Sequence, residues 1–330
     1  MKNTSSPFDD VEEVDFYSPD FIPSRKTNES NSILDSAQSI YKYLDDKVYM
    51  MDDVKKAVST FIYKALKGIN SEKVLLIASE SGTGKSFLIS TLAEIVPNMV
   101  VTCSSSMVPQ GYKGGNHLTT VLNKLDLSPG SVSFVVLDEF NRFLNKGLGS
   151  WADSGLLSEL LVLFDDKDTK INASGSEEKP FWVNPKNIFF ILLGSWSDIT
   201  DNQSKTQFGF CGNPSKVHNN HRPQITKEQI LDTLSNWPEL IGRISRIVVN
   251  DNMSEESILR MLKSTKYSPI HKIEEELNVK IKVPAKKMRE FAAEAYASGT
   301  GVRCVKNAVL EQVDEALFRE GDNLKEVYIH

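Results

Sequence analysis

The sequence has few cysteines, and they are not arranged for metal binding or for disulfide bonding. Cys103, Cys211 and Cys304 are the only three in 330 residues, and no two of them stand at the spacing of metal ligands. Structural zinc sites and disulfide-rich secreted domains both require such pairs. This cysteine usage argues against both classes and favours a reducing, cytoplasmic environment.

Long apolar runs and an excess of basic residues are absent as well. No apolar run reaches the roughly 18 residues of a membrane span, and the N-terminus lacks the basic-then-apolar layout of a signal peptide. The formal net charge is -6, with 44 acidic against 38 basic residues. Such a chain has no broad cationic field for nucleic-acid binding. We therefore expect no membrane insertion and no export, and the charge gives no support for a nucleic-acid partner.

The composition is that of a soluble globular protein with more than one domain. Hydrophobic residues make up 40% and charged residues 25% of a chain longer than one core usually organises. Residues 1–33 are rich in Asp, Glu, Ser, Asn and Pro, which predicts a flexible N-terminal tail. Residues 34–249 alternate short apolar runs with helical stretches, which predicts an α/β domain with a parallel sheet covered by helices. The helical spacing of apolar residues in 250–330 predicts a small, mainly helical domain.

Several elements can be placed from the pattern alone. The expected strands are 74–78, 99–102, 133–137, 188–193 and 327–329, and the clearest expected helices are 54–66, 87–95, 156–164, 254–262, 284–299 and 302–319. The polar stretch 199–224 predicts a long functional or mobile loop.

Residues 79–86, Ser-Glu-Ser-Gly-Thr-Gly-Lys-Ser, lie between an expected strand and an expected helix. The glycines let backbone N–H groups point at phosphate oxygens, where the positive end of the following helix adds to the attraction. Lys85 would reach the outer phosphates, and the Ser86 hydroxyl would contact the bridging Mg²⁺. The first residue departs from the usual pattern, because Ser79 replaces a glycine and would be strained if its φ were positive. The predicted ATP-binding residues of this segment are Ser81, Gly82, Thr83, Gly84, Lys85, Ser86 and Phe87.

An acidic pair supports this interpretation. The buried run 133–137 ends in Asp138 and Glu139. An acid at the carboxyl end of a strand lies beside the phosphate loop, so Asp138 can hold Mg²⁺ through water. Glu139 can polarise the attacking water as a general base. A phosphate loop followed by this pair predicts ATP hydrolysis.

The phosphate loop, the acidic pair and several further segments resemble motifs of the AAA+ unfoldases of the ClpX type, relatives of HslU. The resemblance covers residues 36–329. Residues 44–49 resemble the family's segment in which two apolar residues, here Val48 and Tyr49, flank the adenine. Met50 and Met51 replace the glycine and glutamine that normally follow, and Asn141 replaces the second acid of the Walker B element, residues 137–142. The resemblance implies an AAA+ P-loop NTPase large domain followed by a small helical lid domain.

Arginine motifs in the second half of the chain extend the resemblance. Residues 238–243, Pro-Glu-Leu-Ile-Gly-Arg, are close to the arginine-finger box, which implies that Arg243 projects into the nucleotide site of a neighbouring subunit in a hexameric ring. Residues 299–303 are similar to the sensor-2 motif and give Arg303 that role. The alternatives are a surface salt bridge for Arg243 and an exposed arginine at a helix start for Arg303. Ser195 is the candidate for sensor 1.

Two short segments resemble substrate and partner sites of the family. Residues 111–114, Gly-Tyr-Lys-Gly, match the pore loop, which implies that Tyr112 grips a threaded polypeptide. Phe208, Gly209 and Phe210 resemble the tripeptide that docks on a ClpP-like peptidase, with an unrelated loop as the alternative. The family's zinc-binding N-terminal domain is not expected, because the N-terminal stretch has no cysteine.

The resemblance implies a homohexameric, ATP- and Mg²⁺-dependent protein unfoldase or remodelling chaperone that acts on unfolded or tagged proteins. Two alternatives stay open. One is an AAA+ motor or loader acting on nucleic acid. The other is a nucleotide-responsive assembly factor with little turnover, suggested by Ser79, Met50 and Leu193, which stands where the family often has a small or polar residue.

Overall fold

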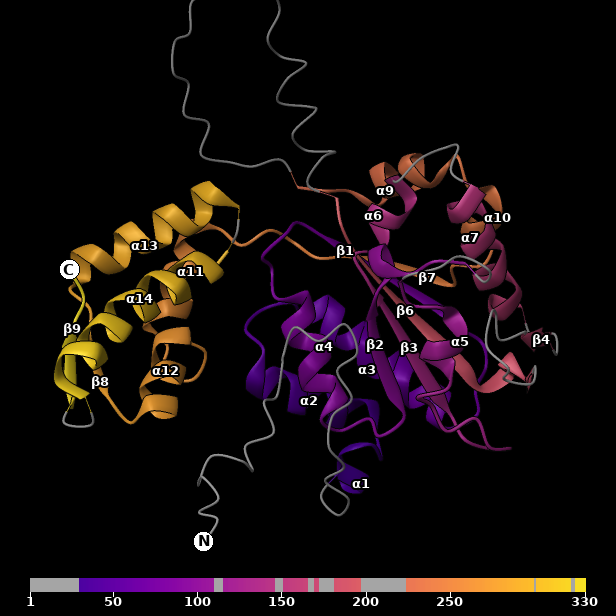
Figure 1. Cartoon of the computed structure of the whole chain (residues 1–330), viewed down its shortest axis with the longest axis horizontal. Coiled ribbons are helices and arrows are strands. Elements are labelled where there is room, and N and C mark those ends of the chain that lie inside the picture. Colours follow the sequence, from indigo (N-terminus) through magenta and orange to yellow (C-terminus); the bar gives the residue numbers. More distant parts are fainter. Residues whose placement is uncertain are drawn as a thin grey trace, which may run out of the picture.

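A parallel sheet lies between two layers of helices, and a further group of helices follows it (Figure 1). The computed structural model describes residues 30–109, 115–145, 151–165, 169–171, 181–196, 224–299, 301–321 and 324–330. The α/β fold with a helix-covered parallel sheet, predicted from the sequence, is confirmed. None of the helices in these ranges is long and apolar enough to cross a membrane.

The sheet has five strands in the order β2-β3-β6-β1-β7, and every neighbouring pair is parallel. The strands are β1 (Val74–Ser79), β2 (Met99–Cys103), β3 (Ser133–Asp138), β6 (Ile188–Ser195) and β7 (Arg246–Val249). The first four match the predicted apolar runs, because strands covered on both faces have no polar alternation. Strand β7 was not predicted, since it is short, half-buried and paired on one side only.

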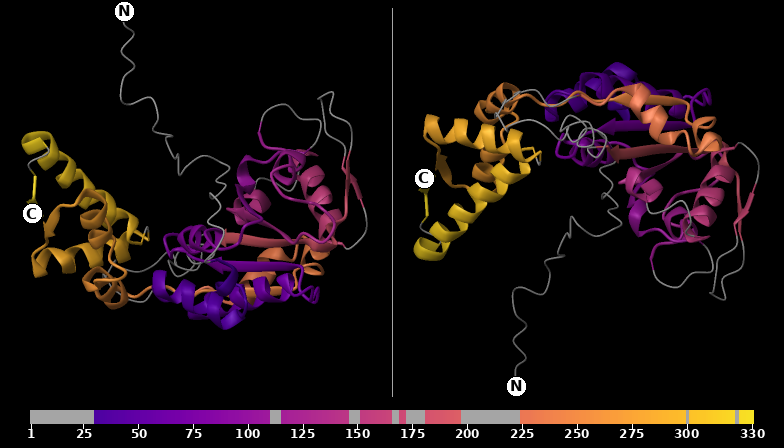
Figure 2. Two further views of the ribbon diagram at one scale, coloured as in Figure 1. Left: turned by 90° about the horizontal axis from the view of Figure 1, so that it is seen from below. Right: turned by 90° about the horizontal axis from the view of Figure 1, so that it is seen from above.

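The two faces of the sheet build two apolar clusters. Leu75 and Ile77 of β1 pack against α2 (Ala37–Lys47), α3 (Asp52–Leu66) and α4 (Lys85–Ala93). The alternate residues, such as Leu76, face the opposite layer. That layer consists of α5 (Leu118–Leu122), α6 (Phe140–Asn145), α7 (Trp151–Phe164), α9 (Lys227–Leu234) and α10 (Pro238–Ile241). Figure 2 shows the sheet between the two layers.

Short elements complete this part of the chain. They are α1 (Ser30–Ile33), the 3-10 turns η1 (Ser104–Ser106) and η2 (Pro185–Asn187), and the antiparallel pair β4 (Thr169–Ile171) and β5 (Phe181–Val183). Because all strands of the sheet run the same way, their carboxyl ends meet at one edge. Residues 79–86 after β1, the predicted phosphate loop and called the phosphate loop from here on, therefore lie at the same edge as the acidic pair after β3.

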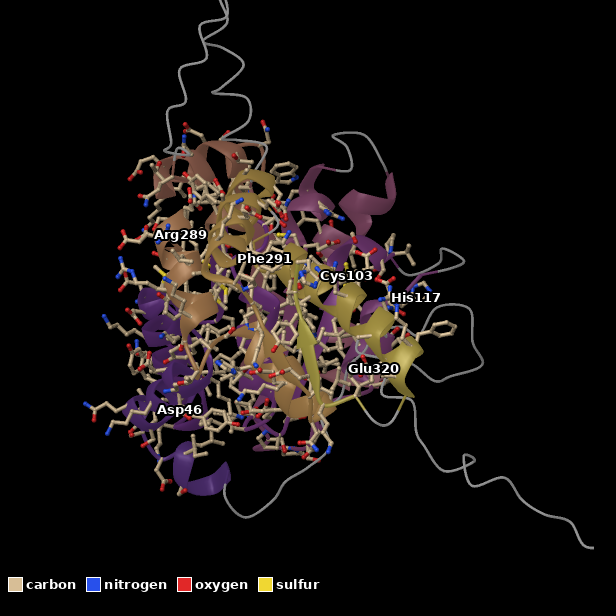
Figure 3. All side chains as sticks on the ribbon, turned by 90° about the vertical axis from the view of Figure 1, so that its left-hand side faces the viewer. Asp46, Cys103, His117, Arg289, Phe291 and Glu320 are labelled. Carbon is tan, nitrogen blue, oxygen red and sulfur yellow. The ribbon has the colours of Figure 1, made fainter. Side chains whose placement is uncertain are left out.

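The residues after 250 form a C-terminal helical cluster with its own apolar core. It comprises α11 (Glu255–Lys263), α12 (Pro269–Leu277), α13 (Ala285–Ser298), α14 (Arg303–Glu320) and the parallel pair β8 (Lys280–Lys282) and β9 (Glu326–Tyr328). Ser254 caps α11, and Gly299 and Gly321 end α13 and α14, as the sequence predicted. In Figure 3, Phe291 lies inside this cluster, whereas Arg289 lies at its exposed edge.

Candidate functional site

The phosphate loop follows β1 and leads into α4. Gly82 and Gly84 have φ angles of 74° and 97°, values that favour glycine over any residue with a side chain. The backbone at Ser79 is not left-handed, so the strain considered for this substitution does not arise. The loop is thus built without a glycine at its first position.

The Ser79 hydroxyl instead interacts with the lysine of the loop. Lys85 Nζ donates to Ser79 Oγ at 2.6 Å and to the Glu80 carbonyl oxygen at 2.7 Å. Ser79 Oγ also lies 2.7 Å from Thr83 Oγ1, whose hydroxyl donates to the same Glu80 carbonyl. All these side chains are buried. The ammonium group therefore has protein partners within the loop, which it must leave to reach a phosphate.

Burial makes the Lys85 ammonium easier to deprotonate. Desolvation lowers the pKa of Lys85 to about 8; the positive charge of Arg303 lowers it too, while Asp138 and Glu80 oppose the shift. Arg303 begins α14, two residues after Gly301, which lies against Gly82 of the phosphate loop. An anionic ligand would complete the neutralisation of these two cations.

Ser86 and Asp138, the two residues predicted to hold Mg²⁺, are in contact. Ser86 Oγ donates to Asp138 Oδ2 at 3.0 Å, although the two residues are 52 positions apart. A hydroxyl and a carboxylate are hard oxygen ligands, and Mg²⁺ usually takes one or two such groups with water and phosphate oxygens. In the described part of the chain, no group of three or more His, Cys, Asp or Glu is arranged to hold a metal ion. The residues present therefore fit Mg²⁺ bound together with a nucleotide.

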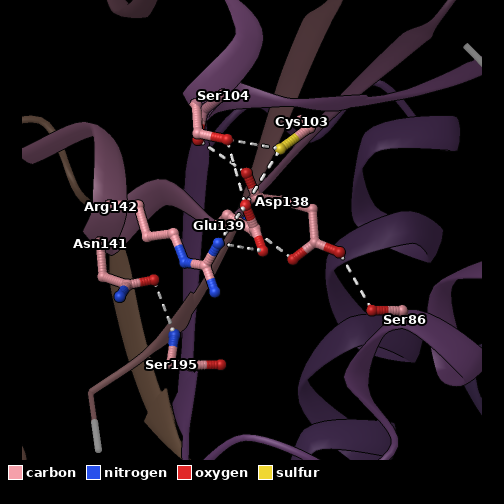
Figure 4. A network of polar contacts seen from close by, with 9 residues as sticks. Ser86, Cys103, Ser104, Asp138, Glu139, Asn141, Arg142 and Ser195 are labelled. Atoms are coloured by element: carbon pink, nitrogen blue, oxygen red, sulfur yellow. Dashed lines mark hydrogen bonds and ion pairs between the residues drawn. The ribbon is translucent and has the colours of Figure 1, made fainter. Parts of the chain in front are cut away.

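Glu139 is held by neighbouring donors in a strained backbone conformation. Its φ is 56°, which is uncommon for a residue with a side chain and is often found at functional sites. Glu139 Oε2 accepts from Cys103 Sγ at 3.3 Å and from Ser105 Oγ at 3.1 Å. Arg142 Nη1 lies 3.2 Å from Oε1 (Figure 4). The carboxylate of the predicted base is thus linked to the end of β2.

Asn141 fixes the neighbouring strand end. Its side chain is buried, and its Oδ1 accepts from the Ser195 backbone N–H at 2.9 Å (Figure 4). Ser195 is also the register partner of Ser79, which places it at the phosphate-loop edge of the sheet. A Cβ on Gly194 would lie 2.2 Å from the Trp196 ring, so Trp196 packs against this strand end and requires glycine there. The Asn141 side chain therefore serves as a structural link between the predicted Walker B and sensor-1 segments.

Arg243 lies away from the phosphate loop of its own chain. Its Nε and Nη2 donate to the two carboxylate oxygens of Asp165 at 2.9 and 3.0 Å, and Nη1 donates to the Glu239 carbonyl at 2.9 Å. The hydrogen bonds with Asp165 raise the pKa of Arg243 above its usual range. The structure therefore does not bring Arg243 together with Lys85 and Asp138 within one chain.

The C-terminal helical cluster covers the phosphate loop. A Cβ on Gly301 would lie 2.2 Å from the Gly82 carbonyl oxygen, and Gly301 has a φ of 62°, so only glycine fits there. The cavity between the loop and the cluster measures about 30 Å³ and is lined by Gly82, Ile258 and Tyr296 among others. This volume holds roughly one or two water molecules. The cavity as it stands is therefore too small for a triphosphate.

The predicted adenine segment is unusual in its backbone. Val48 is buried, and Met50 and Met51 both have positive φ angles, 55° and 64°. The Met51 sulfur would lie 3.7 Å from a Cβ on Gly84, so this turn packs against the phosphate loop. The fully buried Lys55 donates to Asp45 and Val48 and forms an ion pair with Asp52, which ties the two sides of the turn together.

Side chains near α12 bind this segment to the C-terminal helical cluster. The Tyr267 hydroxyl donates to the Asp45 carbonyl at 2.7 Å, and its ring lies 5.3 Å from that of Tyr49. Lys272 Nζ lies 4.0 Å from the centre of the Phe87 ring. Burial lowers the pKa of Lys272. Lys266 pairs with Asp46, an exposed residue labelled in Figure 3.

Some predicted residues are outside the described ranges. These are Tyr112 of the pore-loop match, Phe208, Gly209 and Phe210 of the peptidase-docking match, and Thr300 of the sensor-2 match. Their roles stay predictions.

Sequence reasoning missed several side chains that contact predicted site residues. Cys103 and Ser105 contact Glu139, and Asp165 contacts Arg243. The Asp165 pair joins positions 78 apart. The only available signal was the place of Cys103 at the end of a predicted strand, since carboxyl ends of neighbouring parallel strands meet.

Comparison with known proteins supports the resemblance to the ClpX type. No model of a known protein family matches the chain. The chain is 25% identical over 333 residues to the ATP-dependent Clp protease ATP-binding subunit ClpX 2 of Wolinella succinogenes, covering 92% of this chain and 82% of that protein. It is 22% identical over 338 residues to the ClpX subunit of Treponema denticola, covering 90% and 81%. The resemblance found in the motifs is confirmed and extends over most of the chain.

Proposed function

We propose that this protein is an ATPase that uses hydrolysis to remodel or unfold other proteins. The observation that carries the proposal is the meeting of Lys85, Ser86 and Asp138 at one edge of the parallel sheet. A lysine, a hydroxyl and a carboxylate, following one another in the sequence, are the groups that bind a nucleoside triphosphate with Mg²⁺. The relatives carry ATP-dependent and ATP-binding in their names, which supports the same activity.

Each residue has a defined task in the proposed reaction. Backbone N–H groups of residues 80–84 and the Lys85 ammonium bind the phosphates. Ser86 and Asp138 would hold Mg²⁺, which would supply charge neutralisation at the phosphates. Glu139 accepts a proton from the attacking water. Its carboxylate now accepts hydrogen bonds from Cys103 and Ser105, so activity requires it to turn toward the nucleotide.

The wider mechanism follows from the resemblance. We infer a homohexameric ring in which Arg243 serves the site of the neighbouring copy, Arg303 senses the nucleotide, and Tyr112 grips a polypeptide in the pore. The exposure of Arg243 away from its own phosphate loop is compatible with a role between copies. We further propose that residues 208–210 dock on a ClpP-like peptidase. The net charge of -6 gives no support to the alternative of a nucleic-acid motor.

The experiment compares the wild-type protein with Glu139→Gln in ATP hydrolysis and in equilibrium nucleotide binding. Removal of the base should reduce hydrolysis by at least about 100-fold, the lower range for a lost general base, while ATP still binds. The matched control is Glu256→Gln, because Glu256 is exposed on α11 and pairs only locally with Arg260. This control should hydrolyse ATP as the wild type does.

The same assay separates the candidate substrates. Stimulation of hydrolysis by an unfolded protein, and its retention by Glu139→Gln in ATP, would support protein remodelling. Stimulation by single- or double-stranded DNA instead would establish the alternative motor. If the wild-type protein binds ATP but hydrolyses none, the proposed activity is wrong and the low-turnover assembly factor becomes the better account.

A further inference from the structure

We propose that Asp165 is a positioning residue for Arg243, and that it holds the guanidinium in the orientation from which it acts on a neighbouring copy. This inference rests on the proposed function, because it assumes that Arg243 contacts a nucleotide across a subunit boundary. Asp165 itself lies in no motif that was identified in the sequence.

The geometry is that of a two-point clamp. Two parallel bonds of 2.9 and 3.0 Å join Nε and Nη2 of Arg243 to the two oxygens of Asp165. Such a bidentate arrangement fixes the plane of the guanidinium as well as its position. A third hydrogen bond, from Nη1 of Arg243 to the Glu239 carbonyl, holds the guanidinium at its other amino group. The arginine therefore has one defined orientation rather than the many rotamers of an exposed side chain.

Both partners are anchored in the same apolar core. Asp165 directly follows α7, whose last residue, Phe164, is buried, and Arg243 lies in the turn after α10, where Leu240 is buried. Both anchors belong to the apolar cluster on this face of the sheet. Neither charged group can shift far without disturbing that packing, which makes the pair a rigid feature.

The clamp leaves part of the guanidinium able to bind a ligand. Arginine has five N–H donors. Within the described residues, the three hydrogen bonds to Asp165 and Glu239 use one each, which leaves two. The side chain of Arg243 is 28% exposed, enough for its head to be reached from outside. No contact of Arg243 within the described residues is with residues 79–86. The remaining donors therefore serve an anion that comes from another molecule.

The test measures ATP hydrolysis and nucleotide binding for Asp165→Ala, Asp165→Glu and Arg243→Ala in the full chain. We expect Asp165→Ala to lower kcat about 10-fold, near the lower end of the loss when the partner that orients a functional group is removed. The Kd for a fluorescent ATP analogue should stay within about twofold, because an arginine supplied by a neighbouring copy acts mainly on the charge of the transition state. Asp165→Glu, which keeps the carboxylate, should recover part of the kcat.

A double variant and a mixing experiment separate positioning from a structural role. Asp165→Ala should lower kcat no further when Arg243 is already alanine, since a residue that acts through another is silent without it. Asp165→Ala mixed with Glu139→Gln should be more active than the sum of the two separate proteins, because intact sites then form between copies. The control Glu315→Ala removes an exposed ion pair on α14 and should match the wild type.

Several results would overturn the inference. If kcat for Asp165→Ala equals that of the wild type, the Asp165–Arg243 pair does not matter for hydrolysis. If it is higher, Asp165 restrains Arg243 instead of positioning it. A further fall in the double variant, or an unchanged sum in the mixed sample, would assign Asp165 to folding or to its own site. If the wild-type protein shows no hydrolysis at all, the proposed function fails, and this result is distinct from a selective failure of the Asp165 variants.

Discussion

Removing the Ser79 hydroxyl should make the protein bind ATP more tightly. Lys85 Nζ donates to Ser79 Oγ at 2.6 Å and to the Glu80 carbonyl at 2.7 Å, and it must leave both to reach a phosphate. Hydrogen bonds to charged groups contribute about 1.5–3 kcal/mol to stability. Because the Glu80 carbonyl remains in Ser79→Ala, we take the lower value. Since about 1.4 kcal/mol corresponds to tenfold in an equilibrium constant, the Kd should fall about 10-fold.

The assay is an equilibrium titration with a fluorescent ATP analogue, in a Glu139→Gln background that prevents turnover. Ser90→Ala is the matched control, because the Ser90 hydroxyl donates to the Phe87 carbonyl on the same helix and does not contact Lys85. Its Kd should equal that of the parent. An unchanged Kd in Ser79→Ala would refute the idea that Ser79 restrains the lysine, and a raised Kd would show that the hydroxyl itself contributes to nucleotide binding.

Two further predictions concern the nucleotide-free protein. Because burial lowers the pKa of Lys85 to about 8, the folded chain binds fewer protons than the unfolded chain between about pH 8 and 10. The free energy of unfolding should therefore rise with pH across this window by at most about 3 kcal/mol more than in Lys85→Met, as urea titrations at each pH would show. Met50→Gly should stabilise the fold by roughly 0.5–1 kcal/mol, the left-handed penalty less the entropy of glycine, because Met50 has a φ of 55°. A thermal melt in which Met50→Ala gained as much would contradict this reasoning.

The fold was predictable where the sequence carries a strong and local pattern. The runs 74–78 and 133–137 are apolar at nearly every position, as strands buried on both faces require, and they became β1 and β3. Ser254, Pro284 and Gly299 marked the limits of helices correctly. Strand β7 escaped prediction because an edge strand with Arg246 at its start and one buried position has neither a full apolar run nor a clear alternation.

The site was predictable only in part, because its contacts join distant parts of the chain. Ser86 and Asp138 were expected at the same site, because a phosphate loop and a following strand that ends in an acid meet at one edge of a parallel sheet, and the two side chains are in contact. No spacing rule links Asp165 to Arg243 or Cys103 to Glu139, because these contacts depend on how α7, α10 and β2 meet in space. The restraint on Lys85 by Ser79 was missed for another reason, since the departure from glycine suggested strain rather than a new hydrogen bond.

The contact of Gly301 with Gly82 has a mechanical consequence. It lies at the base of α14, in which Arg303 and Phe318 are about 22 Å apart along the helix axis, 15 steps of 1.5 Å. A tilt of about 10° at that base would carry Phe318, which is 92% exposed, through roughly 4 Å. With the glycine contact as the pivot, a small change in the phosphate loop would therefore be enlarged along α14 into a displacement of several ångströms at Phe318.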